Sequence, residues 1–296
     1  MHTAGCRCKE GNHLMLASTQ HTSNQQRAIY EQQGYLIFPQ FLEEGELGIL
    51  RRALADVLAR AEGLTSSNEW FSLVKARDGA GRYVRRVANP NALHPAFHEI
   101  VFNQKILDVV ESLIGPNIQL HHTKINLKPP SRHAGFEWHQ DFASFPHTNF
   151  DLLAVMLMLD DSTAENGCLQ VIPGSHLWGP RDHLYSRSTT YSSRIEDESV
   201  IPDPSYWVRV AVPAGGIEVH HCNLLHSSLP NSGDKPRSAL LIQYRAADNV
   251  QVGGLVAHYG SGMLVRGELP YRVRMLEGNF GVLSPDKRTP NSPPRL

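Results

Sequence analysis

Apolar residues recur at helical spacing in the first part of the chain. Between about residues 43 and 61 they fall three or four positions apart, which predicts an amphipathic helix. The same spacing predicts a second helix over about 103–114, which Gly115-Pro116 would end. The segment from Ser23 or Asn24 to Gln33 can form a shorter helix that stops at Gly34, and Tyr35 to Phe38 then has the pattern of a short strand.

Beyond Gly115 the pattern changes to short alternating or apolar runs separated by Gly, Pro, Asn and Ser. Such runs predict strands of a β-sandwich or jelly roll. Helices followed by strands indicate an α+β fold, here mainly β, with the N-terminal helices packed on one sheet. The predicted strands are Ile118–Asn126, Phe136–Phe142, Leu152–Leu159, Leu169–Ile172, Trp207–Val212, Gly216–His220 and Ala239–Arg245.

The chain is predicted to form one domain over residues 25–296. Residues 1–24 are rich in His, Gln, Ser and Thr without periodicity, so we expect a disordered tail. Residues 177–206 are polar and show no periodicity, and a segment of this length is commonly a functional cover or an insertion without function. We expect a lid that closes the site when ligands bind, with a plain surface insertion as the alternative.

Composition and charge describe an ordinary globular protein. Of the 296 residues, 41% are hydrophobic and 19% charged, and the formal net charge is −1. Such a balance argues against nucleic acid or an anionic membrane as the main partner. The four cysteines show no disulfide framework, no apolar run is long enough to span a bilayer, and the final Pro-Arg-Leu does not match a peroxisomal address. We therefore expect a cytoplasmic protein with a small-molecule substrate; the sequence does not predict its oligomeric state.

Candidate chemistry lies in His139-Gln140-Asp141, followed far downstream by His226 and then Arg237. Two imidazoles and one carboxylate form the ligand set of non-haem Fe(II) oxygenases. In a strand, His139 and Asp141 would point to one face while Gln140 points away. The turn-like stretch after His226 would place His226 and Arg237 on adjacent antiparallel strands. The alternatives are a solvated His-x-Asp on a loop and a buried structural His226.

The surroundings of this motif resemble the phytanoyl-CoA dioxygenase family, and the likeness covers roughly residues 25–250. It implies a double-stranded β-helix, Fe(II), 2-oxoglutarate as cosubstrate and O2, with ascorbate as a possible reductant. The segments that carry it are Trp138–Phe142, Asp160-Asp161, Glu165–Leu169 and Ile172–His176, with Gly34-Tyr35-Leu36, Gly115–Ile118 and Lys128–Pro130 upstream and His226-Ser227-Ser228, Asn231, Arg237-Ser238 and Tyr244 downstream.

The resemblance assigns His139, Asp141 and His226 as iron ligands. His220 and His221 are rivals for the third place, but His226 occupies the family's Leu-His-Ser-Ser position. Arg237 would hold the far carboxylate of 2-oxoglutarate in a bidentate pair, with a surface arginine as the alternative.

Other assignments are less specific. His122 and Asn126 share one face of a predicted strand with Lys124 and could reach the near end of 2-oxoglutarate, although a core-facing histidine is an alternative. Arg85 and Arg86 cannot both point inward if their segment is extended; one could hold substrate or cosubstrate, or both could be solvated. Trp138, Phe142 and Phe145 could shape the pocket or be plain core. Asn166-Gly167 and Pro173-Gly174-Ser175-His176 are assigned to turns.

The expected reaction is oxidation of a substrate C–H bond, by default hydroxylation, with release of succinate and CO2. The same cofactors could give desaturation, epoxidation or rearrangement in natural-product biosynthesis, or acyl-CoA 2-hydroxylation. We favour a small polar or natural-product substrate. Two other classes stay open: a non-catalytic jelly-roll binding protein, and a Zn or Mn cupin isomerase or hydrolase.

Overall fold

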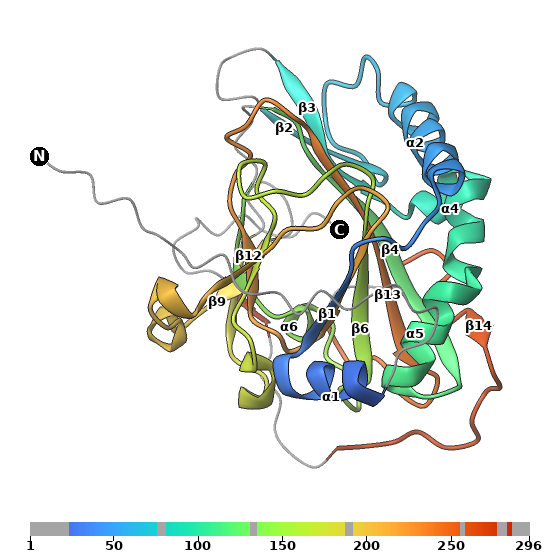
Figure 1. Ribbon diagram of the computed structural model, residues 1–296, viewed down its shortest axis with the longest axis vertical. Helices are drawn as coiled ribbons and strands as arrows, with labels where there is room; N and C mark the ends of the chain where they lie inside the picture. Colours follow the sequence, from blue (N-terminus) through green and yellow to red (C-terminus); the bar gives the residue numbers. More distant parts are fainter. Residues whose placement is uncertain are drawn as a thin grey trace, which may run out of the picture.

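The chain alternates between two facing antiparallel sheets (Figure 1). A computed structural model of the protein describes residues 24–75, 81–130, 135–186, 192–254, 258–276 and 283–285. From β4 to β7 and again from β10 to β13, successive strands fall in the larger sheet (β4, β6, β11, β13) and in the smaller one (β5, β7, β10, β12) by turns. This alternation is that of a double-stranded β-helix, as the sequence predicted.

The larger sheet carries eight strands, in which every pairing is antiparallel. Its long central strands are paired along most of their length, with one register shift between Gln243 and Tyr244. In order, the strands are β1 (Tyr35–Phe38), β11 (Ile217–His221), β6 (Leu152–Met158), β13 (Arg237–Ala246), β4 (Ile118–Lys128), β3 (Arg82–Ala88) and β2 (Phe71–Lys75), with β14 (Leu264–Arg266) beside β4.

The smaller sheet has the order β10 (Val208–Val210), β7 (Leu169–Val171), β12 (His226–Ser228) and β5 (Phe136–His139). Its apolar side chains pack against the inner face of the larger sheet, so the two sheets enclose one core between them. Met156 and Leu241 of the larger sheet meet Leu169 and Val171 of the smaller one in this cluster. A third sheet, β15 (Leu283–Pro285), β8 (His183–Ser186) and β9 (Ser192–Ile195), lies at the side.

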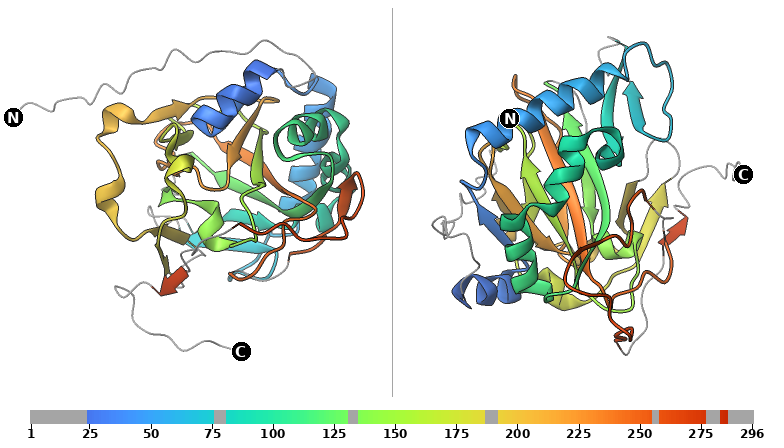
Figure 2. Two further views of the ribbon diagram at one scale, coloured as in Figure 1. Left: turned by 90° about the horizontal axis from the view of Figure 1, so that it is seen from below. Right: turned by 90° about the vertical axis from the view of Figure 1, so that its right-hand side faces the viewer.

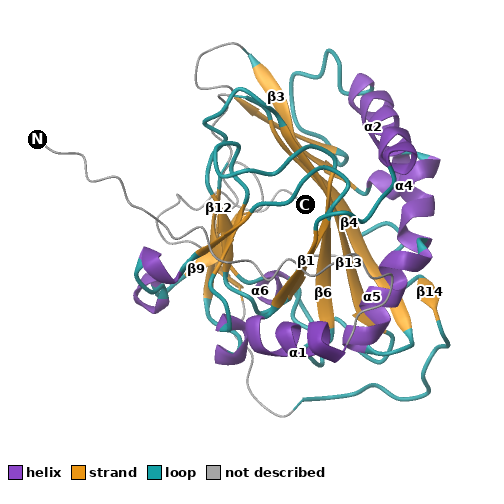
Figure 3. Ribbon diagram, viewed as in Figure 1, coloured by secondary structure: helices purple, strands orange, loops and turns teal. Residues whose placement is uncertain are grey.

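Helices cover the outer face of the larger sheet (Figures 2 and 3), and this confirms the predicted α+β, mainly β fold. The stripe of Leu47, Leu50, Leu54 and Val57 is buried against the sheet, as its spacing predicted. Gly115, at φ 93°, ends the last of these helices. The helices are α1 (Asn24–Gln33), α2 (Glu44–Ala59), α3 (Pro90–Leu93), α4 (Pro95–Glu99) and α5 (Gln104–Ile114), with a 3-10 turn at Ile100–Phe102.

The predicted order of the elements, with helices first and strands afterwards, was wrong in one place. The hairpin β2–β3 lies between α2 and α5 in the chain and extends the larger sheet beyond β4. Its second strand, Arg82–Ala88, carries three arginines, so apolar alternation could not reveal it. Pairing with β4 supplies the stabilisation that the local pattern does not show.

The segment 177–206 contains more structure than its composition predicted. Strands β8 and β9 form an antiparallel pair, and Glu198–Val200 and Pro204–Tyr206 are 3-10 turns. Ile195 is buried against Ile172 and Leu225, so β9 is anchored to the smaller sheet. The predicted tail lies outside the described residues up to residue 23, and Asn24 begins α1. No helix among the described residues is long and apolar enough to cross a membrane.

Candidate metal centre

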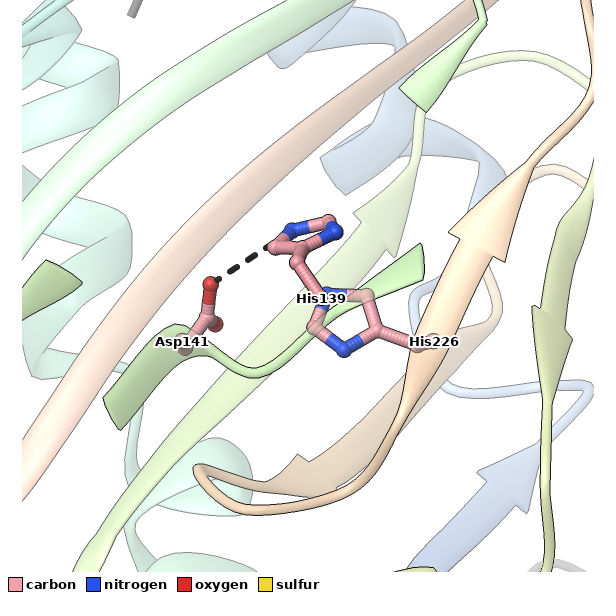
Figure 4. Close-up of side chains that lie close together, drawn as sticks. All are labelled: His139, Asp141 and His226. Carbon is pink, nitrogen blue, oxygen red and sulfur yellow. Dashed lines mark ion pairs between the residues drawn. The ribbon is translucent and has the colours of Figure 1, made fainter. Parts of the chain in front are cut away.

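Three side chains of the predicted metal motif meet on the smaller sheet (Figure 4). His139 is the last residue of β5 and His226 the first of β12, and these two residues pair directly across the strands. Their ring centroids lie 4.1 Å apart. Asp141 completes the group, and one ligand atom from each residue lies within 4.8 Å of the others. The spacing and the ligand types suit one divalent metal ion with positions left open.

The predicted strand through Asp141 was wrong, because β5 ends at His139 and α6 (Asp141–Ser144) begins two residues later. Gln140 causes the change of direction. Its backbone N–H donates to Nε2 of His183 at 2.9 Å, and its side-chain amide donates to the carbonyls of Gly179 and Asn223. Gln140 therefore points away from the metal group, as predicted, while Asp141 approaches His139 from a helix N-terminus.

Backbone carbonyls orient both histidines. Nδ1 of His139 donates to the carbonyl of Glu137 at 2.7 Å, and Nδ1 of His226 donates to that of Leu224 at 2.9 Å. A carbonyl only accepts, so Nδ1 carries the proton and Nε2 keeps its lone pair for a metal. Burial lowers the pKa of both imidazoles, well below the usual value for His226, which favours the neutral, ligating form.

A buried network holds Asp141. The amide of Gln243 on β13 donates to its Oδ2, and Nε2 of His220 on β11 lies 3.5 Å from the same oxygen. Glu218 contacts the other nitrogen of His220 at 2.8 Å. Burial opposes charge on His220, but Glu218 and Asp141 raise its pKa to about 10. Burial alone would raise the pKa of Asp141, yet Lys124 and His220 hold it well below the usual value.

Sequence reasoning missed Glu218 and Gln243. The available signal was weak: a glutamate and a glutamine at single positions within apolar runs, Ile217–Val219 and Ile242–Tyr244. His220, a rival for the third ligand position, instead belongs to the hydrogen-bonded network. His221 points elsewhere, where its Nδ1 accepts from the backbone N–H of Asn223 at 3.0 Å.

Arg237 is buried, with 2% of its surface exposed, so it is not a surface arginine. Its Nη2 contacts only the sulfur of Met156, at 3.5 Å, and its Nε has no hydrogen-bond partner in the part of the chain that the structure describes. Burial lowers its pKa to about 10. A buried guanidinium without a charged partner among the described residues is suited to bind the carboxylate of a ligand.

The predicted placement of His226 and Arg237 on adjacent strands was wrong. β12 belongs to the smaller sheet and β13 to the larger one, so the connecting loop crosses from one sheet to the other. Lys128, which pairs with Arg237 across the strands, differs from it because its buried side-chain nitrogen is fully hydrogen-bonded. Its Nζ donates to the carbonyl of Gly167 at 2.9 Å, to Oγ of Ser228 at 2.7 Å and to the carbonyl of Leu229.

His122 and Asn126 lie on the inner face of β4 at different levels. His122 pairs with Gln243, whose amide reaches Asp141, whereas Asn126 pairs with Ala239, two residues from Arg237. The two residues therefore lie toward the metal end and the arginine end of one stretch of the sheet. His122 also contacts Nδ1 of His121 at 2.8 Å and stacks on His258 at 4.6 Å.

Arg85 and Arg86 both reach the ring of Phe136, at 4.5 and 5.9 Å. The expectation that only one of two adjacent residues could turn inward was wrong, because a register shift in the β2–β3 pairing leaves Arg85 as an extra residue. Arg86 also donates from Nε to the side-chain oxygen of Asn126 at 3.3 Å. Arg85 donates to the carbonyl of Gly135 at 2.7 Å.

The remaining predicted residues are structural. Phe142 and Phe145 belong to a small core cluster with Leu152 and Cys222, and Trp138 packs on Trp207 at 4.9 Å. Gly167 has φ 79° and lies so close to the carbonyl of Leu229 that a side chain would collide with it. The amide of Asn166 donates to the carbonyl of Asp161 at 2.7 Å, as expected of a turn.

An Fe(II)- and 2-oxoglutarate-dependent oxygenase needs two imidazoles, one carboxylate and a cation for the cosubstrate. The double-stranded β-helix offers this set, with a buried arginine on the facing sheet that has no carboxylate partner among the described residues. The family model of phytanoyl-CoA dioxygenase matches residues 30–239 of the chain. The protein belongs to the phytanoyl-CoA dioxygenase family, and it is an iron- and 2-oxoglutarate-dependent dioxygenase that acts on a small molecule.

Individual relatives support this family assignment. The chain is 33% identical over 259 residues to a probable alpha-ketoglutarate-dependent hypophosphite dioxygenase of Stutzerimonas stutzeri, over 86% of this chain and 89% of the relative. Among solved structures, the alpha-ketoglutarate-dependent carbocyclase of nogalamycin biosynthesis is 25% identical, with a TM-score of 0.63 over 89% of this chain and 97% of that one. The iron-bound S. alaskensis EctD shares the fold, with a TM-score of 0.66 at 22% identity over 86% of this chain and 88% of that one.

Proposed function

We propose that His139, Asp141 and His226 hold the iron of this dioxygenase and that Arg237 binds the far carboxylate of 2-oxoglutarate. The observation that supports this most is the pairing of a compact His-Asp-His group on the smaller sheet with a buried arginine that has no carboxylate partner among the described residues of the larger one. Asn126 lies near the Arg237 end of the cosubstrate and His122 near the iron end.

Iron held by His139, Asp141 and His226, with 2-oxoglutarate held by Arg237, would supply the oxidation, in which one atom of O2 goes to succinate with release of CO2 and the other goes to the substrate. The protein supplies position and exclusion of water. Glu218, His220 and Gln243 keep the Asp141 carboxylate in one orientation. Arg237 opposes the charge of the far carboxylate and fixes its distance from the metal group. The apolar side chains between the sheets, among them Met156 and Leu241, keep water away from the reacting atoms.

The test is metal analysis together with 2-oxoglutarate-dependent succinate formation. The wild-type protein should retain about one iron per chain, and Asp141→Ala should lose both iron and turnover, because the anionic ligand disappears. Glu137→Ala is a suitable control, since its exposed carboxylate is close in sequence and only its backbone carbonyl contacts His139. Unchanged turnover in Asp141→Ala would remove this residue from the metal site.

For the substrate we propose a small polar molecule. The hypophosphite dioxygenase is the relative described above with the higher identity, and hypophosphite is therefore the first compound to assay. The second candidate is a natural product, because the carbocyclase of nogalamycin biosynthesis covers nearly the whole chain at 25% identity. Oxygen consumption above the substrate-free rate, measured with hypophosphite and with a library of larger metabolites, separates the two candidates.

We propose that residues 177–206 cover the site. The anchored end of this segment touches the residues around the metal group: Oγ of Ser193 lies 3.3 Å from Oγ of Ser144, and Arg194 lies 3.7 Å from Glu137. Limited proteolysis with and without Fe(II) and 2-oxoglutarate tests closure. If this segment is cleaved at the same rate with and without the two ligands, it is a surface insertion that does not cover the site.

A cytoplasmic location is also proposed. Cys168 and Cys222 are buried free thiols, as expected for a protein kept in a reducing compartment. Fractionation of the producing cells, with detection of the untagged chain, provides the test.

A further inference from the structure

Lys124, at the centre of β4, takes no part in the iron and 2-oxoglutarate site proposed above. It pairs with Leu241 across one edge of its strand and with Ala88 across the other. Directly paired residues of antiparallel strands point to the same face, and Leu241 packs between the two sheets. Lys124 therefore directs its ammonium group into the interior, where it is half-buried.

The ammonium group of Lys124 has no hydrogen-bond or ion-pair partner among the residues that the structure describes. The register places Lys124 near the metal group: Gln243, whose amide bonds Asp141, pairs with His122, which lies two residues from Lys124 on the same face of β4. Burial lowers the pKa of Lys124, and Asp141 opposes this shift. An unpaired interior lysine this close to the metal ligands is costly unless a ligand completes it.

Arg86 is the second member of the pair. It lies on β3 beside β4 and bonds Asn126, the residue two positions from Lys124 on the same face. Its bond to Asn126 uses Nε at 3.3 Å, and its guanidinium lies 5.9 Å from the centre of the Phe136 ring. The two terminal nitrogens of the guanidinium are the ones that bind an oxyanion in a bidentate pair.

This cationic pair is distinct from Arg237. The strand order is β6, β13, β4, β3, and the guanidinium of Arg237 contacts Met156 on β6. Lys124 and Arg86 lie on β4 and β3, on the other side of β13. Lys124 and Arg86 are therefore separated from the guanidinium of Arg237 by β13, and a ligand group bound to them would be a direct neighbour of the cosubstrate proposed above, because His122 and Asn126 flank Lys124 on the same face of β4.

A count of the charges in and around the proposed site leads to the same two side chains. Iron opposes the charge of Asp141, His220 opposes that of Glu218, and iron together with Arg237 opposes the two carboxylates of 2-oxoglutarate. Lys124 and Arg86 then remain without a carboxylate partner among the described residues, and an anion brought by the substrate would balance their charge.

We propose that Lys124 and Arg86 form the substrate subsite, and that it binds a small oxyanion, a carboxylate or a phosphorus oxyanion, close to the atom that is oxidised. This inference rests on the proposed function and narrows its substrate class. It also predicts that neutral substrates bind poorly, because they bring no anionic group for Lys124 and Arg86.

Calorimetric titration of the Fe(II)- and 2-oxoglutarate-loaded enzyme without O2 tests the proposal. The probes are hypophosphite, methylphosphonate and propionate, with propionamide as the neutral match for propionate. We expect saturable binding of at least one oxyanion and none of propionamide. Lys124→Gln and Arg86→Gln should each weaken that binding roughly 10-fold or more, because a charge-assisted hydrogen bond is lost. Lys124→Arg should retain it within a few-fold.

The control is Lys75→Gln, at an exposed lysine that ends β2. Iron content should stay at the wild-type value in all variants, which also shows that they fold. Affinity for 2-oxoglutarate should stay at the wild-type value in the Lys124 and Lys75 variants, whereas Arg86→Gln also removes the hydrogen bond to Asn126. Wild-type affinity for the oxyanion in Lys124→Gln overturns the proposal. So does a loss of 2-oxoglutarate affinity in that variant, which would place Lys124 in the cosubstrate site, or binding of propionamide equal to that of propionate. A wild-type protein that binds neither iron nor 2-oxoglutarate would instead contradict the proposed function.

Discussion

Glu218 is completely buried, and both of its carboxylate oxygens face Nδ1 of His220, at 2.8 and 3.1 Å. The opposite nitrogen of the same ring faces Asp141. The imidazole therefore lies between two carboxylates, one of them a proposed iron ligand, and its positive charge makes the arrangement stable inside the core.

Glu218→Gln should destabilise the protein strongly. Removing one partner of a buried pair leaves the other uncompensated and costs about 3–5 kcal/mol. Urea unfolding of the metal-free protein measures this loss. The control is Glu31→Gln, which breaks an exposed pair with Arg27 on α1 and should cost no more than about 0.5 kcal/mol. Equal losses in the two variants would show that the buried pair adds nothing.

His226→Ala should lose iron, whereas His221→Ala should retain it. His226 presents Nε2 to the metal group, while Nδ1 of His221 is engaged with the backbone of Asn223. His220→Ala should be less stable and less active but still bind iron, because Gln243 continues to hold Asp141. Iron per chain after anaerobic reconstitution gives the answer. An iron-free His221→Ala with a normal His226→Ala would mean that the third ligand is misassigned.

Arg237→Lys should raise the 2-oxoglutarate requirement roughly 10-fold or more, since a bidentate pair becomes a point contact and charged hydrogen bonds contribute about 1.5–3 kcal/mol each. Iron content should not change. Arg266→Lys serves as the control, because Arg266 holds Asp108 and Glu111 at the surface. Ordinary 2-oxoglutarate dependence in Arg237→Lys would exclude this residue from the cosubstrate site.

Acidification should destabilise the fold through neutral buried histidines. Burial lowers the pKa of His147 from 6.5 to about 3 and that of His121 to about 4. At these two histidines the unfolded chain binds protons below pH 6.5 and the folded chain does not, so their contribution to the free energy of unfolding is complete above pH 6.5 and is lost progressively toward pH 4. The slope is about 1.4 kcal/mol per pH unit for each such histidine. Unfolding of His147→Leu should show a shallower slope over this range; parallel profiles would contradict the prediction.

The sequence predicted what local pattern controls. The leucine stripe of α2 and the alternation of β4 and β13 led to the helix-covered sheet, and the motif around His139 led to the three residues that meet in the structure. Whether those residues bind iron, and whether Arg237 binds 2-oxoglutarate, stays a prediction.

What the sequence could not predict depends on long-range pairing. The direction of the chain after His139 is set by hydrogen bonds from Gln140 to residues 39, 43 and 83 positions away. The strand β3 exists because β4 pairs with it, and the bulge at Arg85 follows from its pairing with β2. Glu218 and His220 lie two residues apart on β11, and the pairing of β11 with β1 and β6 is what buries them together.

The location of the candidate ligands on both sheets has a consequence for the lifetime of the protein. Iron would be fixed to β5, α6 and β12, and 2-oxoglutarate would join it to Arg237 on β13, so the two cofactors together tie one layer of the fold to the other. A ligand present at 100 times its dissociation constant adds about 2.7 kcal/mol to the free energy of unfolding. A cell short of iron or 2-oxoglutarate would then hold this protein closer to unfolding and to degradation, and its abundance would follow the supply of both.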